Sequence, residues 1–192
     1  MKALVLPSFV LFCLVLSGCT AYSIHPLYTS EDAVVEPGLE GTWIEADKKD
    51  PSEFCLQKSG AHEYSMVLSG PDSKIVQNYN VNLVRLGDQL FMDMVFKDQT
   101  IDGTKIDDPL GVLATHIILK INLTGDELAY ATLDGDAIKK QNSWESLPLE
   151  YTVLDESMLV TAQTVDLRRY LSVHAYGVFS DYEHLTRKMQ QP

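Results

Sequence analysis

The residues of this chain that could carry out chemistry form no familiar catalytic or metal-binding pattern. Its five histidines are widely separated: His25, His62, His116, His174 and His184. No two stand four residues apart, the spacing that places two zinc ligands on one helix face, and no cysteine partners them. The Gly-x-Ser-x-Gly turn of many hydrolases is absent. We therefore expect no catalytic residue, metal or cofactor, although a triad of Ser or Cys, His and a carboxylate assembled by the fold stays open.

Individual positions point to structural roles. His116 lies on the polar side of an alternating segment, which predicts a solvated side chain, and His174 lies on an apolar helical stripe, which predicts a structural imidazole. The acidic segments 102–108 and 134–136 do not follow the ligand series of an EF-hand, so we interpret them as turns and a helix cap. Cys55, between Phe54 and Leu56, is expected to be a buried small side chain.

The N-terminus has the composition of a secretory signal peptide. An apolar run from Ala3 to Leu16 follows the single charge of Lys2 and ends in Leu16-Ser17-Gly18-Cys19. The run is shorter than the roughly 20 residues that a membrane-spanning helix needs. We therefore expect residues 1–18 to be a signal peptide.

The same four residues resemble the lipobox of bacterial lipoproteins. The resemblance implies that cleavage occurs before Cys19, that its thiol receives a diacylglycerol and that the new amine is acylated. The next residue, Thr20 instead of Asp, resembles lipoproteins sorted to the outer membrane. Two or three acyl chains anchor a protein stably. We expect a lipid-anchored envelope protein facing the periplasm, with its membrane contact through Cys19.

The charge of the chain limits its partners. The formal net charge is −12, and loss of Lys2 with the signal peptide makes it more negative. Such a surface disfavours nucleic acids and anionic lipids. It is explained either by solubility or by a role in binding cations.

From Gly41 onward the pattern is that of antiparallel β-strands. Apolar and polar residues alternate over the segments 63–68, 79–83, 90–96 and 116–123. The turn at 84–90 resembles that at 121–128, and 153–159 is a weaker third copy, each with Gly, Asp or Ser between apolar runs. A meander of this length usually closes, because closure removes exposed edges. We predict a mainly β fold: one barrel domain over residues 39–192, preceded by a lipidated tether over 19–38.

Two helices are expected among the strands. One covers Asp136 to Gln141, with Asp134 or Asp136 as N-cap. The second covers Thr164 to Tyr176, with Thr164 as N-cap and Gly177 just beyond its end. Residues 178–187 are expected to supply the last strand.

Two resemblances support a barrel. Gly41-Thr42-Trp43 resembles the first strand of lipocalins and other calycins, in which the tryptophan closes the barrel floor. The segments His25-Pro26-Leu27-Tyr28-Thr29 and Gly41-Thr42-Trp43, with Leu159-Val160-Thr161-Ala162 running into a helix that ends at His174-Ala175, resemble a group of uncharacterised bacterial lipoproteins. The resemblance implies a location and a lipocalin-like barrel with a C-terminal helix, but no activity.

The segment Lys97 to Leu113 is predicted to be the longest connection between strands. Loops of this length are usually functional or disordered. Its aliphatic residues and two glycines suit a lid over the barrel, whereas the alternative is a surface loop that docks on the outer wall.

These observations favour a binding module for a small apolar ligand or for another envelope component. One alternative is an envelope enzyme acting on lipid or cell-wall material, and another is a structural or assembly lipoprotein without a ligand. An open apolar cavity would favour ligand binding. Convergent titratable groups would favour an enzyme.

Lipid attachment at Cys19 can be tested directly. Cys19→Ala removes the only thiol that the lipobox-like sequence places at the cleavage site, so incorporation of a metabolically supplied labelled fatty acid should be lost. Undiminished label on the variant would show that the lipid is attached elsewhere.

Overall fold

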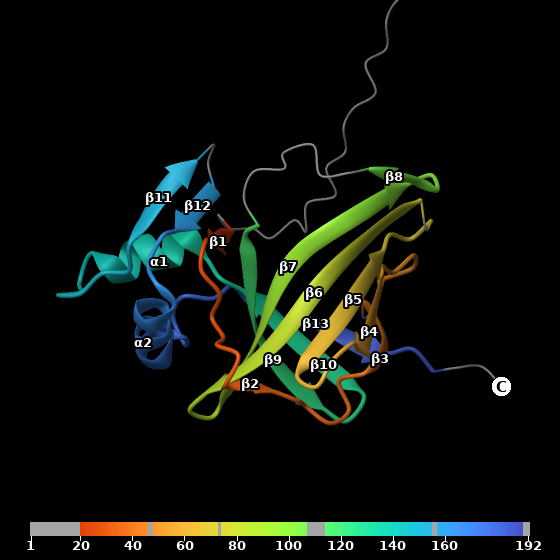
Figure 1. Ribbon diagram of the computed structural model, residues 1–192, viewed down its shortest axis with the longest axis horizontal. Helices are drawn as coiled ribbons and strands as arrows, with labels where there is room; N and C mark the ends of the chain where they lie inside the picture. The colour runs from red at the N-terminus through yellow and green to blue at the C-terminus, as the bar shows by residue number, and fades with distance from the viewer. Residues whose placement is uncertain (1–19, 46–47, 73, 107–113, 155–156, 190–192) are drawn as a thin grey trace, which may run out of the picture.

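A closed antiparallel barrel forms the centre of the molecule (Figure 1). The computed structural model describes residues 20–45, 48–72, 74–106, 114–154 and 157–189. Eight described strands make the barrel: β3 (Gly41–Glu45), β4 (Glu53–Lys58), β5 (Glu63–Ser69), β6 (Ile75–Leu86), β7 (Gln89–Ile101), β9 (His116–Thr124), β10 (Glu127–Thr132) and β13 (Glu183–Arg187). The prediction of a lipocalin-like barrel with a C-terminal helix is confirmed.

Two long-range pairings close this barrel. Strand β7 pairs with β9, and the last strand, β13, pairs with the first, β3. The remaining neighbours are joined mainly by hairpins, of which two turn at Gly87 and Gly125 with φ of +63° and +60°. These left-handed conformations favour glycine, which explains the repeated turn sequences.

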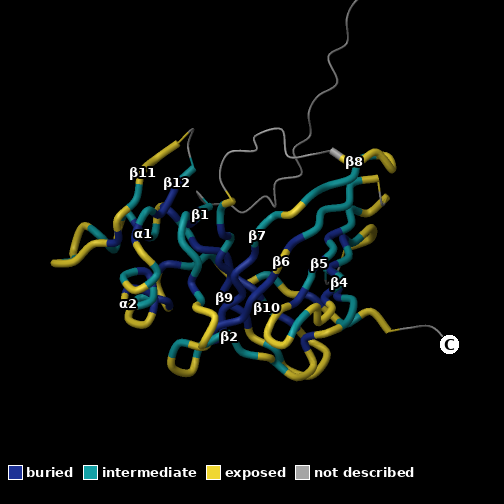
Figure 2. Tube along the Cα trace, in the orientation of Figure 1, coloured by how far each residue is buried: buried dark blue, intermediate teal, exposed yellow. Residues whose placement is uncertain are grey.

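The alternating apolar residues form the core inside the barrel, and Figure 2 shows buried positions concentrated on its central strands. On β6, Tyr79, Val81 and Leu83 are buried inside, as are Met92 and Met94 on β7. The inward face of β9 follows the same rule with Leu119 and Ile121. The predicted period of two is thus confirmed for the interior.

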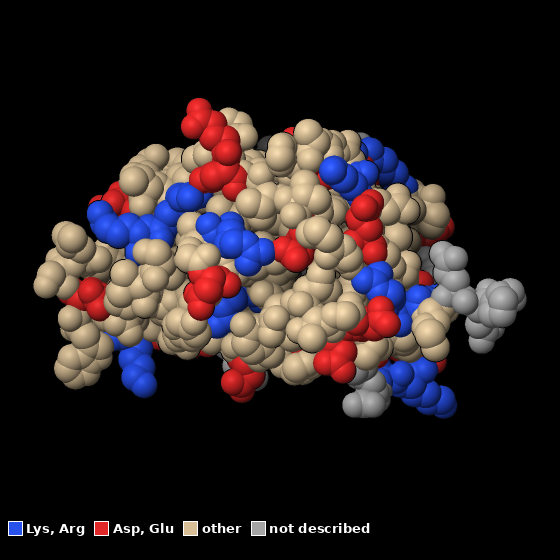
Figure 3. Space-filling model, turned by 90° about the horizontal axis from the view of Figure 1, so that it is seen from below, with Lys and Arg blue, Asp and Glu red and all other residues tan. Residues whose placement is uncertain are grey.

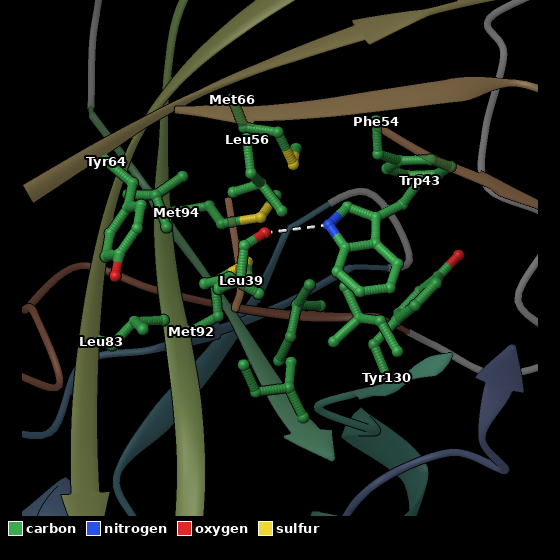
Figure 4. Packing of buried hydrophobic residues seen from close by; sticks show 14 of the residues in the cluster. Leu39, Trp43, Phe54, Leu56, Tyr64, Met66, Leu83, Met92, Met94 and Tyr130 are labelled. Carbon is green, nitrogen blue, oxygen red and sulfur yellow. Dashed lines mark hydrogen bonds between the residues drawn. The ribbon is translucent and has the colours of Figure 1, made fainter. Parts of the chain in front are cut away.

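Trp43 closes one end of the barrel. Its side chain is fully buried, and its Nε1 donates to the Leu39 carbonyl oxygen at 2.9 Å (Figure 4). The Arg187 guanidinium lies 4.2 Å from the centre of the Trp43 ring and donates to the carbonyl oxygens of Glu40 and Gly38. Gly41 has a φ of +141°, and a Cβ there would collide with Arg187 Nη1. Glycine at position 41 therefore suits both this backbone conformation and the close approach of Arg187.

Beneath this floor the surface carries charges of both signs (Figure 3). Figure 3 views the molecule from below and shows acidic and basic side chains interspersed over that face. The Arg187–Asp126 ion pair, with Nε 2.9 Å from Oδ1, lies at this end.

A second layer covers one outer side of the barrel (Figure 1). It contains α1 (Gly135–Asn142), α2 (Thr164–His174) and the short strands β1 (Ala21–Ser23), β11 (Tyr151–Leu154) and β12 (Ser157–Val160). The short strand β2 (Ala33–Val34) lies apart from this layer, at the lower end of the barrel (Figure 1), where Val34 packs against the barrel core. Strand β1 lies between β9 and β12, and β2 pairs with β6. A second apolar core lies between this layer and the barrel wall.

This layer corrects two expectations. Residues 20–38, expected to be a tether, belong to the folded domain: β1 is in the sheet and Leu27 is fully buried. The outer face of β9, expected to be wet, is covered, so His116, Ile118 and Lys120 are buried. Residues 1–19, including the predicted signal peptide and Cys19, lie outside the described part of the chain.

The helix caps agree with prediction at one helix only. Asp134 caps α1, because its Oδ1 accepts hydrogen bonds from the N–H groups of Asp136 and Ala137. The prediction that Thr164 caps α2 is wrong, since Gln163 is the N-cap residue and makes no side-chain cap. The Thr164 hydroxyl donates instead to the Pro26 carbonyl oxygen at 2.7 Å, which ties α2 to the N-terminal segment.

The predicted long connection is shorter than expected. Strand β7 continues to Ile101, and β8 (Thr104–Ile106) pairs back against it, so residues 97–106 are largely a hairpin. Residues 107–113 lie outside the described part, and the lid hypothesis for them stays a prediction.

Trp43→Ala should cost roughly 3–5 kcal/mol in the free energy of unfolding, because it removes a fully buried indole at the point of closure. Trp144→Ala is the matched control, since Trp144 is 80% exposed and should change stability by less than about 0.5 kcal/mol. Denaturant unfolding of both variants measures the difference. Coincident curves for wild type and Trp43→Ala would contradict the role of Trp43.

Candidate functional site

The barrel contains an apolar cavity. Its volume is about 250 Å³, and it lies among inward side chains of β4, β5, β6, β7, β9, β10 and β13, whereas Trp43 is not one of its lining residues. The wall is mostly aliphatic and aromatic, and three methionines contribute to it: Met66, Met92 and Met94. Methionine side chains are flexible and polarizable, so this part of the wall can adapt to different apolar shapes.

The cavity wall carries hydroxyl groups but no charged side chain among its described residues. The Tyr79 hydroxyl donates to Gln77 Oε1 at 3.1 Å, and the Tyr130 hydroxyl donates to Glu183 Oε2 at 2.9 Å. Burial raises the pKa of Tyr79 to about 12. Burial, reinforced by the Glu183 carboxylate, also raises the pKa of Tyr130. Both phenols are therefore neutral at physiological pH, and the cavity suits an uncharged ligand group.

Two residues of the N-terminal segment complete the wall. Thr20 and Tyr22 line the cavity together with the barrel strands. The chain is fixed there because Thr20 bridges to Asp134 and the Ala21 N–H donates to the Leu133 carbonyl oxygen at 3.0 Å. Nothing in the sequence marks these residues as part of a barrel, because their pairing partners are more than 90 residues away.

A buried Asp93–His116 pair lies on the outer wall of the barrel, not in the cavity. His116 Nδ1 is 2.6 Å from Asp93 Oδ1, and the Leu27 N–H donates to Asp93 Oδ2 at 2.6 Å. The expectation of a solvated His116 is wrong, because the N-terminal segment packs over it. Asp93 thus holds the segment around Leu27 against the barrel.

Ser23 lies beside this pair, and the three residue types are those of a hydrolase triad. Ser23 is the register partner of His116 on the adjacent strand. Its hydroxyl, however, donates to the His25 carbonyl oxygen at 2.7 Å, and its side chain is fully buried. A nucleophilic serine needs a hydrogen bond to its base and access to substrate. We assign Ser23, His116 and Asp93 a structural role.

Lys120 occupies an aromatic cage on the same outer side. Its Nζ donates to the Ala175 carbonyl oxygen at 2.9 Å and lies 5.2–5.5 Å from the ring centres of Tyr176, Phe179 and Tyr182. Burial lowers the pKa of Lys120. These contacts fasten the segment that follows α2 to strand β9.

The other residues singled out in the sequence do not converge. His174 is partly buried, with Nε2 3.4 Å from Glu145 Oε1 and its ring tilted by 51° against the Tyr170 ring. His25 Nε2 accepts a hydrogen bond from Gln163 Nε2 at 2.9 Å. Cys55 is half-exposed on the outer face of β4, so the expectation that it is buried is wrong. Within the described ranges, no three His, Cys, Asp or Glu side chains are grouped so that they could hold a metal ion.

No protein-family model matches the chain, and neither does any curated protein or solved structure. The helices of the described residues are too short or too polar to cross a bilayer.

The buried phenols predict a loss of stability at alkaline pH. In the unfolded chain Tyr79 has a pKa of about 10, against about 12 when folded. Between these values the folded protein holds a proton that the unfolded chain has lost, so the free energy of unfolding should fall as pH rises. Denaturant unfolding across this range should show a shallower fall for Tyr79→Phe than for wild type. Equal slopes would indicate that the pKa of Tyr79 is the same in the folded and the unfolded protein.

Proposed function

We propose that this protein is a lipid-anchored lipoprotein of the bacterial envelope whose barrel binds a small apolar molecule. The observation that supports the binding role is the apolar cavity, whose described wall has neutral hydroxyls and no charged group. Its volume of about 250 Å³ exceeds the roughly 150 Å³ of an engineered apolar cavity that takes up benzene. A hydrocarbon chain or a compact apolar ring system fits this chemistry.

The cavity can stay unfilled because contacts outside it hold the barrel together. Closure is provided by the β13–β3 pairing and by the Trp43–Arg187 contact at one end, while the outer core stabilises the walls from outside. The three methionines that line the cavity can change conformation to fit the shape of the ligand.

The proposed location follows from the N-terminal sequence. Leu16-Ser17-Gly18-Cys19 supports removal of residues 1–18 and lipid attachment at Cys19, and Thr20 supports the outer membrane. The domain would then face the periplasm, where apolar molecules need a carrier or a receptor because water dissolves them poorly.

A protein partner is a second candidate, and one observation favours it. Trp144 and Leu147 are 80% and 66% exposed in the connection that follows α1. Large apolar side chains exposed together often mark interaction surfaces. An enzymatic role receives less support, because the Ser23–His116–Asp93 group is buried and its hydroxyl points elsewhere.

Ligand binding can be tested by filling the cavity. Met66 points inward from β5 and lines the cavity, whereas Val67, the next residue, lies on the outer face of the same strand. Met66→Trp should abolish the fluorescence increase of phenylnaphthylamine, an uncharged apolar probe, because the indole occupies the probe's space. Val67→Trp is the matched control and should bind the probe as wild type does.

Circular dichroism verifies that both variants are folded. Native mass spectrometry of the wild-type protein would identify a ligand retained from the cell. Probe binding that persists unchanged in a folded Met66→Trp variant would show that the probe binds elsewhere and would remove the support for a cavity ligand.

A further inference from the structure

The chain enters the barrel wall at the first residue that the structure describes. Thr20 lines the cavity and bridges to Asp134, and the following strand β1 pairs with β9 on one side and β12 on the other. Ala21 and Ser23 are buried. Cys19 is therefore the sequence neighbour of a residue that lines the cavity.

The distance between Cys19 and the wall is set by covalent geometry. Consecutive Cα atoms are about 3.8 Å apart, so Cys19 is one peptide unit from a residue that lines the cavity. A group attached to Cys19 is therefore joined to the chain one residue away from the cavity lining.

We propose that one acyl chain of the lipid on Cys19 enters the barrel and is the cavity's resident occupant. This inference rests on the proposed function, because it needs both lipid attachment at Cys19 and a cavity that accepts apolar groups. The remaining acyl chains stay in the bilayer, and two chains suffice for stable anchoring. The partner is thus a named part of the same molecule and not a separate ligand.

The chemistry of the wall fits this occupant. An acyl chain is uncharged and flexible, and the described lining contains no charged group. Met66, Met92 and Met94 can pack against a chain of varying conformation. The hydrocarbon is removed from water equally well in the bilayer and in the barrel, so neither location has a large hydrophobic advantage.

Proximity then favours occupancy. A group joined by a very short connection reaches an effective concentration on the order of millimolar or above. A free apolar molecule must compete with it, so the lipid anchor would regulate access to the cavity. The barrel of the anchored protein would accept a ligand only when that ligand displaces the acyl chain.

The test uses full-length protein purified from the membranes of cells grown with a diazirine-bearing fatty acid. Irradiation should join the lipid of the Cys19 peptide to peptides of β5 or β7, which carry Met66, Met92 and Met94. Met66→Trp should abolish these internal cross-links and Val67→Trp should preserve them. If Met66→Trp does not fold, Met94→Trp replaces it. The pattern of cross-linked peptides in the wild-type protein tests the inference without either variant.

Other outcomes separate this inference from the proposed function. Phospholipid adducts in the cavity, with none from the Cys19 lipid, would overturn it while leaving a ligand-binding barrel. A labelled Cys19 whose cross-links lie only on the outer surface or on bilayer lipids would also overturn it, and phenylnaphthylamine binding would then report on the cavity separately. Absence of label on Cys19 would overturn both this inference and the proposed anchor.

Discussion

The contact between the Arg187 guanidinium and the Trp43 ring joins the two strands at which the barrel closes. Arg187 lies on the last strand and Trp43 on the first, and the same guanidinium binds the carbonyl oxygens of Gly38 and Glu40. A cation over an aromatic face is attracted by the ring's electrons, and its hydrogen bonds fix the turn that leads into β3. Gly41 is the residue that permits this approach. Because this contact holds the barrel closed at one end, the cavity in its interior can remain unfilled.

The wall formed by β6, β7 and β9 is buried on both faces over part of its length. Its inner face contributes to the barrel core, and its outer face packs against α1, α2 and the N-terminal segment. Two buried polar groups on that outer face have a defined partner in the covering layer. Asp93 binds the Leu27 N–H and Lys120 binds the Ala175 carbonyl oxygen. Because an unpaired buried charge is costly, these bonds set where the covering segments dock.

This second layer brings the N-terminus into the functional part of the molecule. Residues that precede the barrel in sequence become part of its wall, since Thr20 and Tyr22 line the cavity. The proposed lipid anchor and the proposed ligand site are therefore structurally continuous. A barrel tethered by a flexible linker would separate the two, whereas here the residue that follows the proposed anchor leads directly into β1, whose Tyr22 lines the cavity.

The amino-acid sequence by itself determined the β-barrel class, because inward and outward residues alternate locally and hairpin turns use neighbouring residues. The inward face of β7 and a cap of α1 at Asp134 or Asp136 were predictable for the same reason, whereas the role of Trp43 as the floor was implied by the resemblance of Gly41-Thr42-Trp43 to lipocalins. Only the tertiary structure decided that His116 is buried, that Thr164 bonds to Pro26 and that Thr20 lines the cavity. Each depends on a contact between residues far apart in the chain, and local periodicity carries no information about such partners.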